Sequence, residues 1–348
     1  MNKPKPTATW LLAIALTAGC YVLVDHLREG AARPAAIPSP AIVAMVVGIV
    51  VGNLLPHGSR FKSGARSIIT GAIPLAIVCM GAGLDLGILT DPRVGLGGLG
   101  ICLLAIGAAL ALGIFAARLF GLSRNTSYLL GVGTAICGSS AIIATSPVIG
   151  ADEDELVLTV ATVNLMGLVV MFALPPLCVG MGLSGQASGI LAGATIHAIP
   201  QAIAAGDAMG DVAGTFATLF KLVRVSMLAP AVLLVGLLAR RSLDAPQETQ
   251  GSPGPTPSLV PWFLWGFLVL AALRTAGWID FEVSPVGTAL GDQVKWLGKA
   301  LLAVSMVAIG FELPLRQLLG VGAKAIAAGL IASAGLVSVV LVLVTLLF

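Results

Sequence analysis

Charged residues are scarce in this chain. Lys, Arg, Asp and Glu together make up 10% of its 348 residues, whereas a soluble globular domain carries about 25%. Hydrophobic residues reach 57%, and the mean hydropathy is +1.03. This composition excludes a soluble globular protein. A net charge of +3, with the basic residues gathered at the ends of apolar stretches, gives no indication of a nucleic-acid partner.

Groups for catalysis and metal binding are scarce as well. The chain has three histidines, and His197 has no second histidine or carboxylate at the spacing of metal ligands. No Gly-x-Ser-x-Gly elbow is present. The five cysteines lie in apolar stretches, where we expect them to pack as small hydrophobic residues and not to form disulfides. We therefore predict no enzyme activity, no metal site and no cofactor.

Long apolar stretches dominate the sequence instead. Stretches of about 20 residues, each long enough to cross a bilayer, recur along nearly the whole chain. The alternating segments of about ten residues that build a membrane β-barrel are absent. The sequence predicts a single all-α polytopic transmembrane domain over residues 1–348, with about 9 to 11 membrane elements. The predicted spans are 9–24, 41–55, 68–89, 95–120, 156–180, 212–239, 260–278, 296–313 and 323–348.

One stretch is polar enough to lie outside the membrane. Residues 242–258 are rich in Pro, Gly, Ser and Gln, which predicts a flexible loop. Arg240 and Arg241 precede this loop, and basic residues also gather at the ends of other spans. The positive-inside rule then predicts a cytoplasmic loop and a cytoplasmic N-terminus.

Two polar, glycine-containing breaks interrupt the apolar pattern near the middle of the chain. The first reads GTAICGSSAI at 133–142, and the second reads GATIHAIPQAI at 193–203. They interrupt the apolar segments 127–149 and 188–209 and resemble each other. Paired breaks in membrane helices are the best indication of a transport site that a sequence offers.

The similarity between the two breaks continues downstream. Residues 159–180 and 215–236 share a Thr-x-Ala-Thr start, a methionine, a proline and a Val-Gly pair. We interpret the two stretches as copies of an internal repeat. The copies are inverted if each broken segment is re-entrant, and parallel if each is a spanning helix with a central break. Arms of about eleven residues reach about half the hydrocarbon thickness and fit both arrangements. A weaker similarity between GLDL at 83–86 and GFEL at 310–313 favours the inverted one.

The breaks also predict helix N-termini at membrane depth. Gly138 supplies flexibility, Ser139 and Ser140 are good N-cap residues, and Pro200 suits the first residue of a half-helix. Helix N-termini attract anions through free N–H groups and the positive end of the helix dipole. Two such ends predict an anion site. The alternative is a pair of packing kinks without a ligand.

Charged side chains near the breaks extend this hypothesis. Lys221 and Arg224 stand three residues apart in an apolar span and so share a helix face. Charges at this depth line a site or are paired, so these two either attract an anion or pair with Asp85 or Glu312. The two acids are also candidate sites for a coupling ion. His197 is either a hydrogen-bonded structural residue or a proton carrier. The predicted substrate-binding residues are Thr134, Gly138, Ser139, Ser140, Thr195, His197, Gln201, Lys221 and Arg224.

At these motifs the chain resembles the YeiH-like sulfate exporter family of bacterial inner-membrane proteins. The matching stretches are IPLAIVCMGAGLDL, GVGTAICGSSAIIATSPVIGADEDE and GATIHAIPQAIAAGDAMGDVAGTFATLFKLVRVSMLAPAVLL. The resemblance implies about ten membrane elements and a secondary transporter of a small inorganic or sulfonate-derived anion in the inner membrane. The chain departs from the family at Ala198, where an acidic residue commonly follows the histidine, and at Pro200, which precedes Gln201. The missing carboxylate beside His197 leaves the break more positive, which suits an anion.

Several functions remain open at this point. The leading hypothesis is a secondary transporter that exports a sulfate-like or sulfite-like anion by alternating access. The second is a Na⁺- or H⁺-coupled carrier of another small organic anion. An intramembrane hydrolase that uses Ser139 or Ser140 with His197, and a passive channel, are further alternatives. The expected partners are the anion, a coupling ion and the bilayer, and the sequence leaves a homodimer open.

Overall fold

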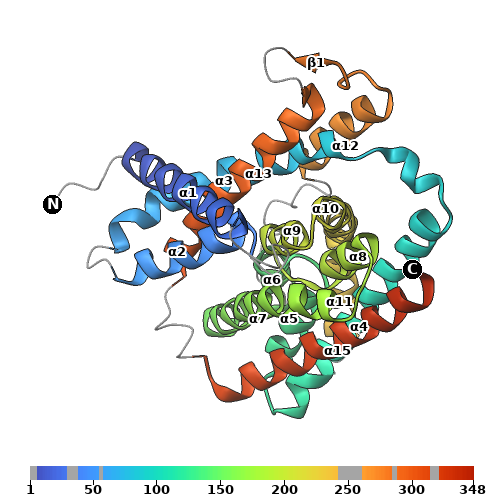
Figure 1. Cartoon of the computed structure of the whole chain (residues 1–348). Helices are drawn as coiled ribbons and strands as arrows, with labels where there is room; N and C mark the ends of the chain where they lie inside the picture. Colours follow the sequence, from blue (N-terminus) through green and yellow to red (C-terminus); the bar gives the residue numbers. More distant parts are fainter. Residues whose placement is uncertain (1–5, 30–37, 55–57, 242–260, 284–287, 314–320) are drawn as a thin grey trace. The chain divides into compact units, whose positions relative to one another are not determined.

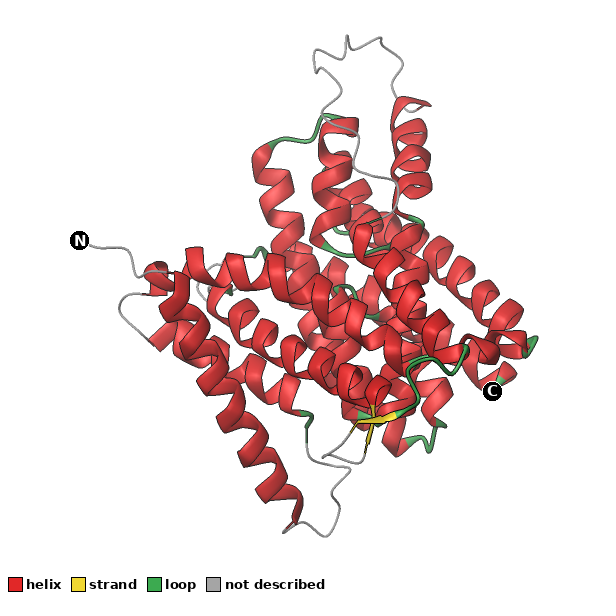
Figure 2. Cartoon of the chain, turned by 90° about the horizontal axis from the view of Figure 1, so that it is seen from above, coloured by secondary structure: helices red, strands yellow, loops and turns green. Residues whose placement is uncertain are grey.

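The chain is almost entirely helical. The computed structural model describes residues 6–29, 38–54, 58–241, 261–283, 288–313 and 321–348, and Figure 2 shows helices nearly everywhere in them. The predicted loop at 242–258 lies outside the described residues. The chain divides into two compact units, which are described separately. Unit 1 comprises Met1–Asp91, Ala204–Thr215 and Trp262–Arg316, and unit 2 comprises Pro92–Ile203, Phe216–Pro261 and Gln317–Phe348.

Unit 1 is built around α13, against which α2 and α3 pack (Figure 1). Backbones approach closely here, since a Cβ added to Gly310 of α13 would lie 2.5 Å from the nitrogen of Ile49 in α2. Small residues permit such packing between membrane helices. The elements of unit 1 are α1 (Pro6–Glu29), α2 (Pro40–Leu54), α3 (Gly58–Met80), η2 (Gly81–Gly83), η3 (Leu86–Thr90), α12 (Trp262–Thr275), the antiparallel strands β1 (Glu282–Val283) and β2 (Thr288–Ala289), and α13 (Leu290–Glu312).

Unit 2 holds both predicted breaks. Its long helices α4 and α15 pack against each other, and α4 also packs against α5 (Figure 1). The elements are η4 (Arg93–Gly97), α4 (Gly98–Leu119), α5 (Arg124–Ala135), α6 (Ser139–Ile149), α7 (Glu153–Gly180), α8 (Gly185–Thr195), α11 (Leu228–Arg241) and α15 (Ala323–Leu347). Two further helices, α9 (Ile199–Ala208) and α10 (Asp211–Ser226), have residues in both units.

The helices have the length and composition of membrane spans. Six described helices are long and apolar enough to cross a bilayer, and α10 with α11 makes a seventh if this pair, bent by 44°, is one span. Large apolar side chains such as Leu104, Phe115 and Leu119 on α4 are exposed, as lipid-facing positions require. The prediction of an all-α polytopic membrane protein is confirmed.

Two details of the predicted spans differ. The span predicted at 68–89 ends earlier, because α3 stops at Met80 and two short 3₁₀ helices follow. The spans predicted at 41–55 and 260–278 correspond to α2, with 15 residues, and α12, with 14. These two helices are shorter than a typical span of about 20 residues. All five cysteines are free, as predicted.

The first broken segment is a re-entrant helical hairpin. Asn125 near the start of α5 donates a hydrogen bond from Nδ2 to the Gly150 carbonyl just after α6, at 3.5 Å. The same amide donates to Glu155 at the start of α7, at 3.1 Å. The two arms therefore begin and end together, and α7 starts beside them. Each arm, at 1.5 Å per residue, is about 16–18 Å long, which is about half the thickness of a 30 Å hydrocarbon layer.

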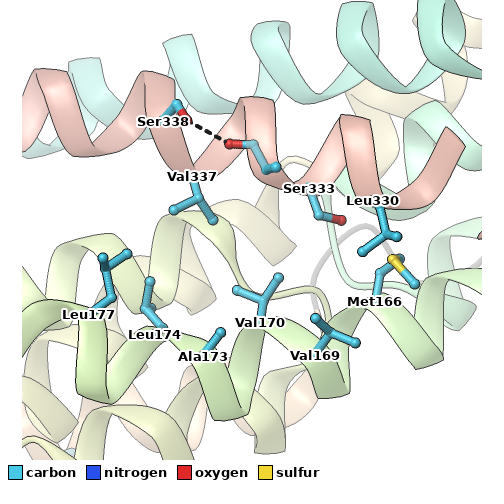
Figure 3. Close-up of a pocket in the computed structure, with 11 residues that line it drawn as sticks. Met166, Val169, Val170, Ala173, Leu174, Leu177, Leu330, Ser333, Val337 and Ser338 are labelled. Carbon is cyan, nitrogen blue, oxygen red and sulfur yellow. Dashed lines mark hydrogen bonds between the residues drawn. The ribbon is translucent and has the colours of Figure 1, made fainter. Parts of the chain in front are cut away.

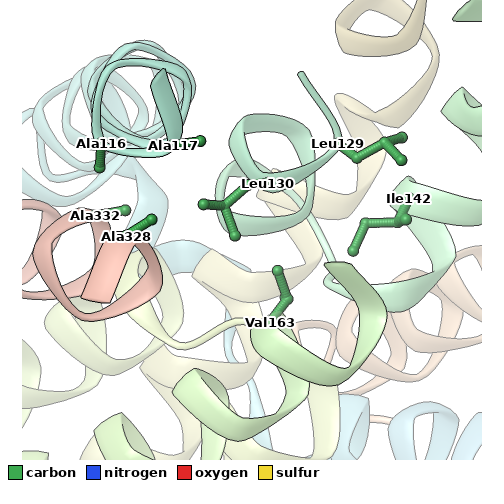
Figure 4. Close-up of a cluster of buried hydrophobic side chains, with 8 residues drawn as sticks. All are labelled: Ala116, Ala117, Leu129, Leu130, Ile142, Val163, Ala328 and Ala332. Carbon is green, nitrogen blue, oxygen red and sulfur yellow. The ribbon is translucent and has the colours of Figure 1, made fainter. Parts of the chain in front are cut away.

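A cluster of buried side chains holds this hairpin in unit 2. Leu129 and Leu130 of α5 meet Ile142 of α6 and Val163 of α7 (Figure 4). The remaining members are alanines, which allow α4 and α15 to approach: Ala116, Ala117, Ala328 and Ala332. The return of α6 is also visible at Gly133, where an added Cβ would lie 2.8 Å from Ile142 Cδ1. Since the arms pack on each other, the first copy of the predicted repeat crosses the membrane once. The repeat itself stays a prediction.

The close approach of α4 to the hairpin can be tested at Gly113. A Cβ added there would lie 2.6 Å from Gly131 Cα in α5. We expect Gly113→Leu to push the helices apart and to cost about 1–3 kcal/mol of stability, which lowers the melting temperature of the detergent-solubilised protein by several degrees.

Gly107→Leu is the matched control. It lies in the same helix, and no atom would lie within 4 Å of its added Cβ. Both changes alter helix propensity equally. Equal melting temperatures for the two variants would contradict the packing described for α4 and α5.

Candidate functional site

The first break is a three-residue turn at the tip of the hairpin. α5 ends at Ala135, and Gly138 has φ +72° and ψ −127°, a conformation that residues with a Cβ rarely adopt. Gly138 is the N-cap of α6, and Ser139 and Ser140 are its first two residues. The prediction that the serines are the N-cap is therefore wrong by one position. The reason is that the turn needs positive φ at its last residue, which favours glycine there.

The second break has the same length. α8 ends at Thr195, residues 196–198 are not helical, and α9 begins at Ile199. Pro200 is thus the second residue of α9, one later than predicted. Proline is tolerated in this first turn because an N–H at that place would have no acceptor within the helix.

The two breaks lie side by side against the middle of α7. A Cβ added to Gly138 would lie 3.9 Å from His197 Cβ and 3.6 Å from Val163 Cγ1. A Cβ added to Gly167, one turn further along α7, would lie 3.4 Å from His197 Cβ and would overlap the side chain of Gln201. Only a small residue at Gly167 leaves room for that glutamine. The fold thus brings the two breaks, which are distant in sequence, to one place.

Lys221 joins the two breaks. Its side chain is fully buried, and Nζ donates hydrogen bonds to the carbonyls of Ile136 and Ile196, both at 2.7 Å, and to the carbonyl of His197. The two isoleucines occupy equivalent positions in the two similar segments. An ammonium group has three N–H donors, so all of them are used on backbone carbonyls.

Arg224, one turn later on α10 and also fully buried, binds the same two helix ends. Nε and Nη2 donate to Ala135 at 2.9 and 2.6 Å, and Nη2 also donates to Thr134 at 2.5 Å. On the other side, Nη1 donates to Gly193 and Ile196 at 3.4 and 3.3 Å. The last carbonyls of a helix have no intrahelical donor and carry the negative end of its dipole. The two cations cap the C-terminal ends of α5 and α8.

The charge of these cations is not neutralised by carboxylates. Within the described part of unit 2, neither Lys221 nor Arg224 forms an ion pair. The helix C-termini offset roughly half a charge each, but the adjacent N-termini of α6 and α9 add about the same amount. The place where the breaks meet therefore keeps about two positive charges.

Two polar atoms beside the breaks lack partners. His197 Nδ1 and Gln201 Oε1 are buried and have no hydrogen bond in the structure, although buried polar groups are paired in the great majority of cases. His197 Nε2 lies 3.4 Å from the hydroxyl of Ser333 in α15, which is neither of the serines predicted as its partner. The first N–H groups of a helix also lack acceptors, and in α6 these belong to Ser139 and Ser140. Unpaired donors and polar side chains thus gather where the positive charge is highest.

The remaining predicted residues take other positions. Thr134 contributes its carbonyl to Arg224, and the Thr195 hydroxyl donates to Leu191 in its own helix at 2.7 Å. Asp85 and Glu312 belong to unit 1. The carboxylate of Asp85 is exposed and accepts a hydrogen bond from Gly87 at 2.8 Å, which caps η3.

Two residues of the site were not predicted from the sequence. Gly167 provides the space for Gln201, and Ser333 is the partner of His197. An isolated glycine inside an apolar span indicates a close approach of another group, so Gly167 could have been found. Ser333 is one of several serines in apolar helices, and nothing in the sequence connects it with His197.

An apolar groove of about 270 Å³ runs between α7 and α15 (Figure 3). Met166, Val170 and Leu174 line one side, and Leu330, Ser333 and Val337 line the other. Ser338, also in its wall, donates its hydroxyl to the Ala334 carbonyl at 2.9 Å. With so few polar groups the groove itself does not fit an anion.

Comparisons with known proteins match most of the chain. The family model described as "Conserved hypothetical protein 698" matches residues 9–329. The chain is 30% identical to UPF0324 membrane protein BMEI1914 of Brucella melitensis over 90% of its length and 83% of that protein. It is 34% identical to UPF0324 membrane protein TauZ of Paracoccus denitrificans over 82% of each.

A third relative matches over a shorter stretch. UPF0324 membrane protein RB0971 of Rhizobium meliloti is 41% identical over 196 residues, which is 56% of this chain and 54% of that protein. The chain therefore matches about half the length of this relative. No solved structure matches the chain.

The capping role of Lys221 leads to a stability prediction. Lys221→Met keeps most of the side-chain volume but leaves the buried carbonyls of Ile136 and His197 without their donor, while Ile196 keeps the hydrogen bond from Arg224. Because each buried unpaired group costs about 1–3 kcal/mol, we expect a marked fall in the melting temperature of the solubilised protein, or failure to fold.

Lys324→Met is the control, since it removes an exposed lysine of α15 and the same formal charge. We expect it to change stability by no more than about 0.5 kcal/mol. An equal melting temperature for Lys221→Met and the wild type would show that the hydrogen bonds from Lys221 to the carbonyls do not stabilise the two breaks.

Proposed function

Since the chain belongs to the Conserved hypothetical protein 698 family, that of the UPF0324 membrane proteins, we propose that it is a secondary transporter of a small inorganic oxyanion, sulfate or sulfite. One observation carries this proposal. Lys221 and Arg224 are buried where two helix breaks meet, and no carboxylate of the described part of unit 2 neutralises them. A buried excess of positive charge at membrane depth is stabilised by an anion and disfavours a cation.

The two cations act on the anion through charge and not as its direct ligands. Their N–H groups are used on carbonyls of α5 and α8, so a bound anion takes its hydrogen bonds from other donors. The free N–H groups of Ser139 and Ser140 are suitable, because a helix N-terminus binds oxyanions readily. Because the cations bind carbonyls and other groups bind the anion, Lys221 and Arg224 can stay in place while an anion enters and leaves.

His197 and Gln201 complete the proposed site. If His197 Nε2 accepts from the Ser333 hydroxyl, Nδ1 carries the hydrogen and can donate to the anion. The amide of Gln201 has two N–H donors and lies in the first turn of α9. Both side chains are buried. His197 Nδ1 lacks a partner in the structure, and an oxyanion can accept its hydrogen, whereas the unpaired Oε1 of Gln201 is itself an acceptor and has to face away from the anion.

Other parts of the proposal rest on the resemblance to the YeiH-like sulfate exporters. They are the direction of transport, which we propose to be export, and a location in the bacterial inner membrane. A cytoplasmic N-terminus rests on the distribution of basic residues. Alternating access accounts for transport because a buried site must open to each side in turn. A re-entrant hairpin that ends at the site offers a short element whose movement changes access.

Transport by the purified protein in liposomes tests the proposal. We expect saturable uptake of radiolabelled sulfate or sulfite that is accelerated by unlabelled anion inside, which distinguishes a carrier from a channel. Gln201→Ala should raise KM about tenfold or more, because it removes one hydrogen bond to a charged group. Arg224→Ala should abolish transport, but it also removes the caps of α5 and α8 and so is informative only if the variant folds.

Gln293→Ala is the matched control, since this glutamine is in unit 1 and its Nε2 donates to Thr288. It should transport like the wild type. Folded protein that carried no small anion would overturn the proposal, and an unchanged KM in Gln201→Ala would remove this residue from the site.

A further inference from the structure

A partly buried cluster of charges in unit 1 is not used by the proposed anion site. Asp207 lies in the last turn of α9, and its side chain is only 9% exposed. Its Oδ1 lies 3.1 Å from Nζ of Lys299 in α13, close enough for the charges to attract. The hydrogen bond from this lysine goes instead to Asp211 Oδ1, at 2.5 Å. Asp207 Oδ1 is left buried without an aligned donor.

The two aspartates that share Lys299 differ in their surroundings. Asp211, at the start of α10, has a side chain that is 76% exposed and keeps a good hydrogen bond. Asp207 is shielded from water and sits at the C-terminal end of a helix, where the dipole disfavours a negative charge. Burial and the helix end favour its protonated form, and Lys299 favours its charged form. These opposing effects make Asp207 the group in this cluster that is best placed to change its protonation.

The neighbouring charged groups come from three helices. Tyr21 and Asp25 lie on α1, Lys295 lies with Lys299 on α13, and Asp211 lies on α10. Asp25 is exposed and neighbours Tyr21, so the charges next to Asp207 are those of Asp211, Lys295 and Lys299, which together balance its charge when all are ionised. A proton on Asp207 leaves Asp211 as the hydrogen-bonded partner of Lys299. A Na⁺ ion fits this place less well, because the Lys299 ammonium already occupies the position of a bound cation.

We propose that Asp207 binds and releases one proton in each transport cycle and so couples anion movement to the proton gradient. The proton comes from water, adds to Oδ1, and returns to water on the other side when the ion pair with Lys299 forms again. It travels with the anion and offsets part of its charge, so an anion that is exported down its own gradient carries the proton out with it. Asp207 is on the helix whose first turn carries Gln201, so one helix bears both groups. This assignment rests on the proposed anion transport.

The first test compares Asp207→Asn with Asp211→Asn in liposomes under an imposed pH gradient. One proton per cycle changes the steady-state accumulation of labelled anion about tenfold per pH unit. We expect this response in the wild type and in Asp211→Asn, and no response in Asp207→Asn, which should still exchange labelled for unlabelled anion. A gradient of Na⁺ should have no effect on any of the three.

Asp207→Asn that responded to the pH gradient like the wild type would overturn the assignment, as would a wild type that transports sulfate without any response to pH. Dependence on Na⁺ that is lost in Asp207→Asn would also overturn it. Absence of sulfate and sulfite transport in the wild type contradicts the proposed function instead.

A second measurement does not depend on the substrate. Infrared difference spectra during a pH titration report the carbonyl stretch of a protonated, buried carboxyl group. We expect such a band in the wild type and in Asp211→Asn, and its loss in Asp207→Asn. A titration without this band, or with a band that persists in Asp207→Asn, would exclude Asp207 as the proton site whatever the protein transports.

Discussion

A helix that is interrupted inside a membrane leaves carbonyl groups that water cannot satisfy, and this requirement governs unit 2. α5 and α8 both end among buried residues, and their last carbonyls would each cost several kcal/mol if left unpaired. Lys221 and Arg224 donate from a single face of α10 to carbonyls at both of these helix ends. Neutral side chains could satisfy the carbonyls too, but they would not leave a positive charge behind. The same contacts that permit the breaks therefore create the electrostatic condition for binding an anion.

The small residues around the breaks follow from this arrangement. Gly138 has to turn with positive φ so that α6 can return along α5, and Gly167 has to be small so that Gln201 can lie against α7. Because α7 touches both breaks near its middle, it acts as the common support. The apolar cluster around Leu130 and Val163 then fixes the hairpin against α4 and α15. The packing of α7 and of the apolar cluster therefore holds the two breaks at the position where Lys221 and Arg224 cap them.

Much of this architecture could be predicted from the sequence, because apolar length, breaks and isolated charges all have local signatures. Those signatures located both breaks to within one residue and identified Lys221 and Arg224 as partners on one helix face. The acceptors of these two side chains could not be predicted, because every residue has a backbone carbonyl and the sequence does not indicate which ones lie nearby. The re-entrant course of α5 and α6 depends on the contact of Asn125 with Gly150, which arm length alone did not indicate. Asp207 and Lys299 are 92 residues apart, and only the fold brings them together.

The helix α9 carries both a residue of the proposed anion site, Gln201, and the proposed proton site, Asp207. Gln201 lies in its first turn and Asp207 in its last, six residues and so about 9 Å apart along the axis. Its N-terminal end belongs to a region with excess positive charge, and its C-terminal end carries a buried aspartate beside Lys299. An anion stabilises the first end, and a proton stabilises the second. Since Gln201 and Asp207 lie on this one helix of ten residues, a movement of α9 displaces the binding groups of both ligands. Transport of an anion together with a proton requires such a shared movement of the two binding groups.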